Sequence, residues 1–163
     1  MHAELLRTAA KLLCVDAAGS PPTRCELRRA VSTVYYAVFH HVSGICSDLL
    51  VGDASSGLSR ARLQVYRSLD HKQVLDACQK AKIPTADFPK PIADYSALFL
   101  NAYKSRCKAD YDPTPDGDFN MPQALHKIGE AEEAIRRFDS AELSHRRAFA
   151  VLVAVKRPKG DRA

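Results

Sequence analysis

A cation, an anion and a phenol lie close together in the segment Arg106-Cys107-Lys108-Ala109-Asp110-Tyr111, which Asp112-Pro113 follows. A guanidinium in such a cluster can bind phosphate or stabilise negative charge that develops during a reaction. Arg106 and Asp110 are also four residues apart, so on a helix they share a face and can form an ion pair worth about 0.2–0.5 kcal/mol. Both interpretations of Arg106 are therefore open: a functional residue, or half of a surface ion pair.

Proton transfer at this segment needs a group that titrates near neutral pH. A carboxyl with an ordinary pKa near 3.9, as in Asp110, is ionised at pH 7, and a phenol with a pKa near 10, as in Tyr111, is neutral. We expect these two side chains to assist Arg106, and we add His71, which lies four residues after Arg67 and so shares a face of the expected helix. The alternative for His71 is a polar surface or interhelical residue.

Basic side chains are in excess, and some could meet Arg106. The net charge is +5 and the pI is about 9.0, which favours polyanionic partners such as RNA. We predict that Arg28, Arg29 and Arg67 converge with Arg106 on a phosphate-binding cleft. The alternative is that these arginines lie on ordinary solvated faces.

Metal and cofactor motifs are missing from the sequence. The five cysteines are widely spaced and form no Cys-x-x-Cys pair, which argues against a zinc site and a disulfide framework. No P-loop, Rossmann glycine pattern, His-Glu-x-x-His or Gly-x-Ser-x-Gly is present, so we expect no metal and no cofactor. The longest apolar run, residues 148–155, is far shorter than the roughly 20 residues of a membrane span, and we expect a cytoplasmic protein.

Apolar residues recur at helical spacing nearly throughout the chain, and no stretch alternates as a strand does. We predict one all-α domain over residues 1–157, an up-and-down bundle of about five helices, followed by a frayed tail at 158–163. Thr23 and Glu26 fit a capping box at the start of the second helix. The expected helices run from about residue 3 to 18, from the Thr23 cap to the loop that begins at Gly52, from Ser59 to near residue 83, and from about 92 to 111. The last starts around Asn120 and extends past Arg147, with a break near Asp139-Ser140 as an alternative.

Two of these helices carry sequence segments that together resemble the motifs of the HEPN superfamily. One is the segment Arg28-Arg29-Ala30-Val31-Ser32-Thr33-Val34-Tyr35-Tyr36-Ala37-Val38-Phe39-His40, and the other is the Arg-x-x-Ala-Asp-Tyr segment at Arg106. Residues 66–71 and 146–150 extend the resemblance over most of the chain. It implies a helical bundle that dimerises, so that two arginine motifs face one cleft.

The resemblance implies two kinds of function. Many HEPN domains are metal-independent endoribonucleases of toxin–antitoxin or anti-phage systems, in which the arginine and a histidine four to six residues later act during attack by the RNA 2′-OH. Others are non-catalytic modules that dimerise or pair with a nucleotidyltransferase or another defence subunit. In this chain Asp110 and Tyr111 occupy the stretch where that histidine is expected, which favours the second kind, whereas the basic charge and Arg106 favour an RNA-directed protein.

Overall fold

The computed structural model describes residues 1–15, 19–114 and 119–155, and within these ranges all regular secondary structure is helical. The predicted all-α class is therefore confirmed. The described helices are α1 (His2–Lys11), α2 (Arg24–Val51), the short 3₁₀ helix η1 (Ala54–Ser56), α3 (Ser59–Ser68), α4 (His71–Ala81), α5 (Lys90–Tyr111), α6 (Met121–Asp139) and α7 (Leu143–Ala154).

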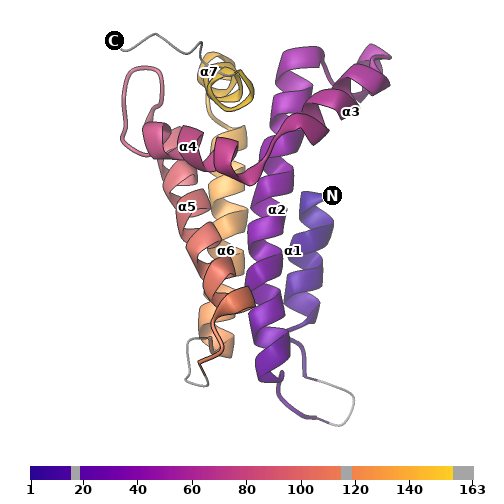
Figure 1. Cartoon of the computed structure of the whole chain (residues 1–163), viewed down its shortest axis with the longest axis vertical. Coiled ribbons are helices and arrows are strands. Elements are labelled where there is room, and N and C mark those ends of the chain that lie inside the picture. Colours follow the sequence, from indigo (N-terminus) through magenta and orange to yellow (C-terminus); the bar gives the residue numbers. More distant parts are fainter. Residues whose placement is uncertain (16–18, 115–118, 156–163) are drawn as a thin grey trace.

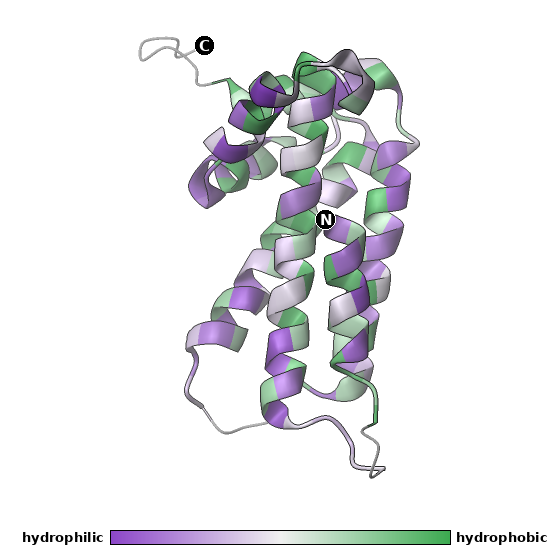
Figure 2. Ribbon diagram, turned by 90° about the vertical axis from the view of Figure 1, so that its right-hand side faces the viewer, coloured by the Kyte–Doolittle hydropathy of each residue, from purple (hydrophilic) through white to green (hydrophobic). Residues whose placement is uncertain are grey.

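Four helices form the body of the molecule. The helices α1, α2, α5 and α6 run along its long axis, and α3, α4 and α7 gather at one end (Figure 1). The 28-residue α2 is central, since it packs against α1, α3, α5, α6 and α7. Hydrophilic residues alternate with hydrophobic ones along each of these helices (Figure 2), as expected for amphipathic helices that share one core.

The expectation of about five helices is wrong in its count, because two of the expected helices are each broken in two among the described residues. The third is interrupted at Leu69, which adopts an extended conformation (φ −81°, ψ 127°) and is buried. The carboxylate of Asp70 then caps α4 by accepting a hydrogen bond from the Gln73 amide at 2.7 Å. Leu69 is thus buried at the point where α3 ends, and α4 starts in a new direction (Figure 1).

The second break separates α6 from α7 at residues 140–142. This break lies next to Asp139-Ser140, where a break in the last expected helix is the alternative prediction. The residues beyond 155, which include the expected tail at 158–163, lie outside the described part of the chain. Arg67 and His71 also end up in different helices, so the expectation that they share one helix face is wrong.

The N-terminus of α2 is capped as the sequence predicts. The Thr23 side chain accepts a hydrogen bond from the Glu26 amide, and the Glu26 carboxylate accepts one from the Thr23 amide at 2.7 Å. The helix that this cap starts carries Tyr35, Tyr36, His40 and His41, which take part in the contacts described below.

A polar network at the centre of the bundle joins α2, α5 and α6. His41 is buried, with its Nδ1 2.8 Å from the Tyr95 hydroxyl and its Nε2 3.2 Å from a carboxylate oxygen of Asp139. The Tyr95 hydroxyl also donates to the Val38 carbonyl at 3.2 Å. Because unpaired polar groups in a core are costly, this network favours one arrangement of the three helices over others.

A search of the helices in the described ranges finds none with both the length and the apolar character that crossing a membrane requires.

Candidate functional site

The end of α5 is held against α2 by Arg28. Its Nε donates to the Ala109 carbonyl at 2.7 Å, and its Nη2 donates to the carbonyls of Lys108, at 3.1 Å, and of Asp112. These carbonyls belong to the last turn and cap of α5, where backbone acceptors lack helical partners and the helix dipole favours a cation. The guanidinium of Arg28 is therefore engaged by the backbone, and it positions the segment that contains Arg106 and Tyr111.

Arg106 faces α2 and is largely covered. Its Nη2 donates to the Tyr36 hydroxyl at 3.1 Å, and its Nε lies 2.7 Å from Oδ2 of Asp110. The Nε–H does not align with the carboxylate as a hydrogen bond, so this contact is an ion pair. The Arg106 and Asp110 side chains are only 17% and 22% exposed, which makes the pair less screened than a fully exposed one.

Two phenol rings lie against the Arg106 guanidinium. The ring centroids of Tyr111 and Tyr36 are 4.9 and 5.7 Å from Cζ, distances typical of cation–π contacts. Burial acts to lower the pKa of Arg106, but the hydrogen bonds to Tyr36 and Tyr111 and the charge of Asp110 outweigh it and raise this pKa. Tyr111 itself is 68% exposed, so it covers the guanidinium from the solvent side.

His71 reaches the same region from a different helix. It is the first residue of α4, and its Nδ1 lies 2.6 Å from the buried Tyr35 hydroxyl. Its ring packs on Phe39 at 4.4 Å and contacts Tyr36 at 6.4 Å between centroids. Because Tyr36 also contacts Arg106, a histidine and the key arginine flank one phenol.

The environment of His71 favours its neutral form. Partial burial and the positive charge of Arg106 lower its pKa from the ordinary 6.5, against a smaller opposing effect of Asp70. Burial raises the pKa of Tyr35 well above its ordinary value, so that phenol keeps its proton. A phenol can both donate and accept, and it can therefore hold either tautomer of the imidazole.

A second imidazole–phenol pair lies beside the first. The Nδ1 of His40 is 2.6 Å from the Tyr66 hydroxyl of α3, and the two rings stack with centroids 5.8 Å apart. Burial lowers the pKa of His40, with smaller contributions from the N-terminal amine and His71. Neither this pair nor Tyr36 is among the predicted site residues, and the available signal was the spacing of Arg29, Tyr36 and His40, which places them along one face of α2.

The remaining predicted arginines lie on the surface. Arg29 is exposed and lies two helical turns before Tyr36 on the same face of α2. Arg67 is exposed in the last turn of α3, and no contact among the described residues links it to Arg106. The structure thus brings Arg28, Arg106, Asp110, Tyr111 and His71 into one region and leaves Arg67 apart from it.

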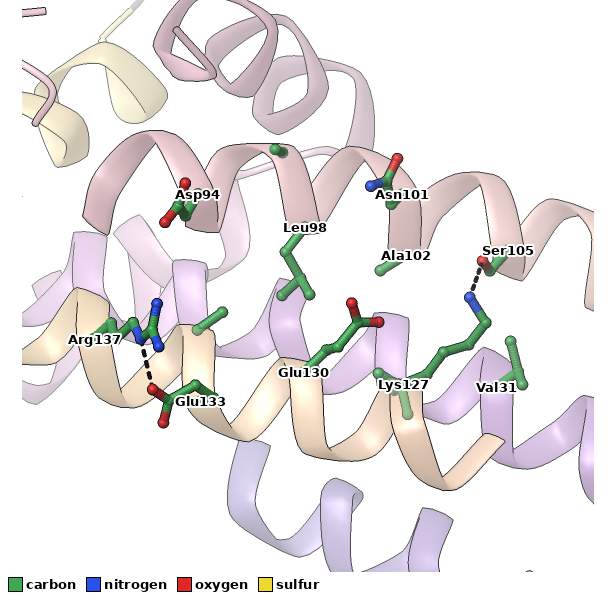
Figure 3. A pocket seen from close by; sticks show the side chains of 13 residues that line it. Val31, Asp94, Leu98, Asn101, Ala102, Ser105, Lys127, Glu130, Glu133 and Arg137 are labelled. Atoms are coloured by element: carbon green, nitrogen blue, oxygen red, sulfur yellow. Dashed lines mark hydrogen bonds and ion pairs between the residues drawn. The ribbon is translucent and has the colours of Figure 1, made fainter. Parts of the chain in front are cut away.

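A separate groove runs between α5 and α6, and Val31 and Val34 of α2 also line it. It encloses about 330 Å³, and charged side chains from both helices line it (Figure 3). The Lys127 ammonium donates to Ser105 at 3.0 Å, and Glu133 pairs with Arg136 and Arg137. Its charges are thus partly neutralised by one another. In the described ranges no group of three or more His, Cys, Asp or Glu side chains could hold a metal ion.

Comparison of the chain with protein-family models, with curated proteins and with solved structures finds no match.

Proposed function

We propose that the chain is an RNA-directed HEPN-type domain of a prokaryotic toxin–antitoxin or anti-phage system, acting in the cytoplasm through the site around Arg106. The observation that carries the proposal is the joint contact of Arg106 and His71 with Tyr36. A guanidinium can stabilise negative charge on a phosphate, and a neutral imidazole can take up a proton, and metal-independent RNA cleavage uses both functions. Here the imidazole comes from α4, whereas the resemblance leads one to expect it on the helix of the arginine.

The arrangement supports transesterification at an RNA phosphate. In such a reaction a base removes the proton of the 2′-OH, the oxygen attacks the adjacent phosphorus, and the 5′-oxygen leaves with a proton. Arg106 would stabilise the added negative charge on the phosphate oxygens. His71 would take or give a proton at Nε2 while the Tyr35 hydroxyl holds Nδ1, and no hydrogen bond within the described residues engages that Nε2.

A second function is favoured by a different observation. Arg106 is paired with Asp110 and hydrogen-bonded to Tyr36, so in this state its guanidinium is occupied. That arrangement suits a non-catalytic HEPN module, which would dimerise or pair with a nucleotidyltransferase or another defence subunit. Under this alternative Arg106 joins α2 to α5, and His71 joins α2 to α4.

Cleavage of RNA in the presence of EDTA separates the two functions. Total RNA is incubated with the protein, with Arg106→Ala and with His71→Ala, and Arg136→Ala on α6 serves as a charge-matched control. The nuclease requires metal-independent cleavage by the protein and the control, abolished in Arg106→Ala and strongly reduced in His71→Ala. No cleavage by a folded protein excludes the nuclease and leaves the module.

We further propose that the chain forms a homodimer, as the resemblance implies. Sedimentation should therefore show a species heavier than the 18.0 kDa chain. A strict monomer at high concentration contradicts this part of the proposal.

A further inference from the structure

We propose that the exposed ring of Tyr111 is a stacking platform for the nucleobase next to the phosphate that Arg106 binds. This inference rests on the proposed RNA-directed function and assigns a residue that selects unpaired RNA over duplex RNA. The observation behind it is that one large aromatic side chain of the site is both exposed and already packed on the key arginine.

Tyr111 differs from the other phenols of the region. Tyr35 is fully buried, and Tyr36 is half-buried between Arg106 and His71. Tyr111 is 68% exposed at the last residue of α5. An exposed aromatic ring beside a cation is how proteins hold unpaired bases, because stacking and cation–π contacts act on any base.

The ring of Tyr111 is already oriented in the unbound protein. Its centroid lies 4.9 Å from Cζ of Arg106, so one face of the ring rests on the guanidinium. Arg28 fixes the backbone on either side of Tyr111 by donating hydrogen bonds to the carbonyls of Ala109 and Asp112. A ring held in this way loses little conformational entropy when a base stacks on its other face.

The surface next to Tyr111 can accommodate the RNA phosphates on either side of the one that Arg106 binds. Arg29, Tyr36 and His40 lie on one face of α2 at intervals of seven and four residues, which spans about 16 Å along the helix. The exposed Arg29 lies at one end of this row and His40 at the other. A strand that follows the row passes Arg106 at its middle, where Tyr36 contacts the guanidinium.

Base pairing would hide the face that Tyr111 needs. A duplex presents stacked bases whose faces are inaccessible, whereas an unpaired nucleotide can turn its base onto an aromatic side chain. The inference therefore requires that the affinity depend on an unpaired base and not on phosphate charge alone.

Binding of three labelled oligomers tests the inference. These are a single-stranded RNA, an abasic ribose-phosphate strand of equal length, and the matching RNA duplex, each measured by fluorescence anisotropy at fixed salt. The protein is compared with Tyr111→Leu, which removes the aromatic face, with Tyr111→Phe, and with Arg106→Gln. Circular dichroism shows whether each variant is folded.

We expect Tyr111→Leu to lose about tenfold in affinity for the single strand, with little change for the abasic strand. Tyr111→Phe should restore most of that loss, and the protein should prefer the single strand to the duplex. Equal affinities of the protein and Tyr111→Leu for the single strand, or an equal loss for the abasic strand, overturn the stacking role.

If the proposed RNA-directed function is wrong, the binding measurements give a different pattern. If the protein binds none of the oligomers, or if Arg106→Gln binds them as well as the protein does, the RNA-directed site is rejected together with its platform. If Arg106→Gln loses affinity for all three oligomers while Tyr111→Leu loses none, only the platform is rejected.

Discussion

The Nε of Arg106 lies 2.7 Å from Oδ2 of Asp110, one helical turn further along α5. This pair matches the ion pair that a spacing of four residues allows, but it is more enclosed than a surface pair. The Asp110 carboxylate therefore competes with any phosphate for the same guanidinium. Asp110 could instead hold the Arg106 guanidinium in the orientation that binds a phosphate. Removal of the Asp110 carboxylate distinguishes these two roles.

Asp110→Asn should strengthen RNA binding. Removing one negative charge a few ångströms from the bound phosphate should raise the affinity about threefold to tenfold at low salt, and less at high salt. The free energy of unfolding should fall by no more than about 1 kcal/mol. Titrations at two salt concentrations measure the first effect and urea denaturation the second. If a folded Asp110→Asn binds RNA more weakly, Asp110 orients the Arg106 guanidinium toward the phosphate and does not compete with the phosphate for it.

Tyr95→Phe should destabilise the fold without affecting the site. The substitution leaves His41 Nδ1 without its partner in the core and removes the donor to the Val38 carbonyl. A loss of about 1–2 kcal/mol in the free energy of unfolding is expected. The matched substitution Tyr111→Phe removes a hydroxyl from an exposed ring and should change stability by less than about 0.5 kcal/mol. Equal effects of the two variants in denaturant titrations would argue against the buried network.

Arg28→Gln and Arg29→Gln remove the same charge from neighbouring residues but should act differently. Arg28 bridges three carbonyls at the end of α5, so its loss should lower the free energy of unfolding by about 1–3 kcal/mol. Arg29 is exposed, so its loss should leave stability within about 0.5 kcal/mol and weaken RNA binding through lost phosphate attraction. Denaturation and binding curves for both variants check this division of roles. A stable Arg28→Gln would show that Arg28 does not hold α5.

Stability should fall as the solution becomes mildly acidic. Burial is the largest cause that lowers the pKa values of His2, His40 and His71 below the ordinary 6.5. The unfolded chain therefore binds more protons than the folded one near this pH, and stability rises with pH there. The contribution is fully present above pH 6.5 and is lost as the pH falls through 6.5 toward the lowered folded values.

Urea midpoints at pH 7.5, 6.5 and 5.5 measure this dependence. The midpoint should decrease with each step down, and His40→Gln should show a shallower decrease than the unmodified chain. Midpoints that stay constant or rise toward pH 5.5 would falsify the assignment of neutral histidines.

The sequence was sufficient for features that depend on neighbours along the chain. The capping box of Thr23 and Glu26 and the pairing of Arg106 with Asp110 need only local helical geometry. The break at Leu69 was not predicted, because the apolar spacing of residues 59–83 also fits a continuous helix. The local sign of the break was Asp70, an N-cap residue, with Gln73 three positions later.

The aromatic surroundings of the site depend on tertiary structure. His71 meets Tyr35 only because the start of α4 lies against α2, and His40 meets Tyr66 only because α3 packs against α2. No spacing in the sequence specifies these crossings. The same holds for Arg28, whose contact with the carbonyls of α5 bridges about 80 residues of chain.

The most direct test of the central claim is the affinity of Arg106→Gln for single-stranded RNA, with Arg136→Gln as a charge-matched control on α6. Both variants lower the net charge by one, so a difference between them reports the site and not the overall charge. The account predicts at least a tenfold loss for Arg106→Gln and less than about a twofold loss for the control, both proteins being folded. Equal affinities of the two variants would contradict a site centred on Arg106.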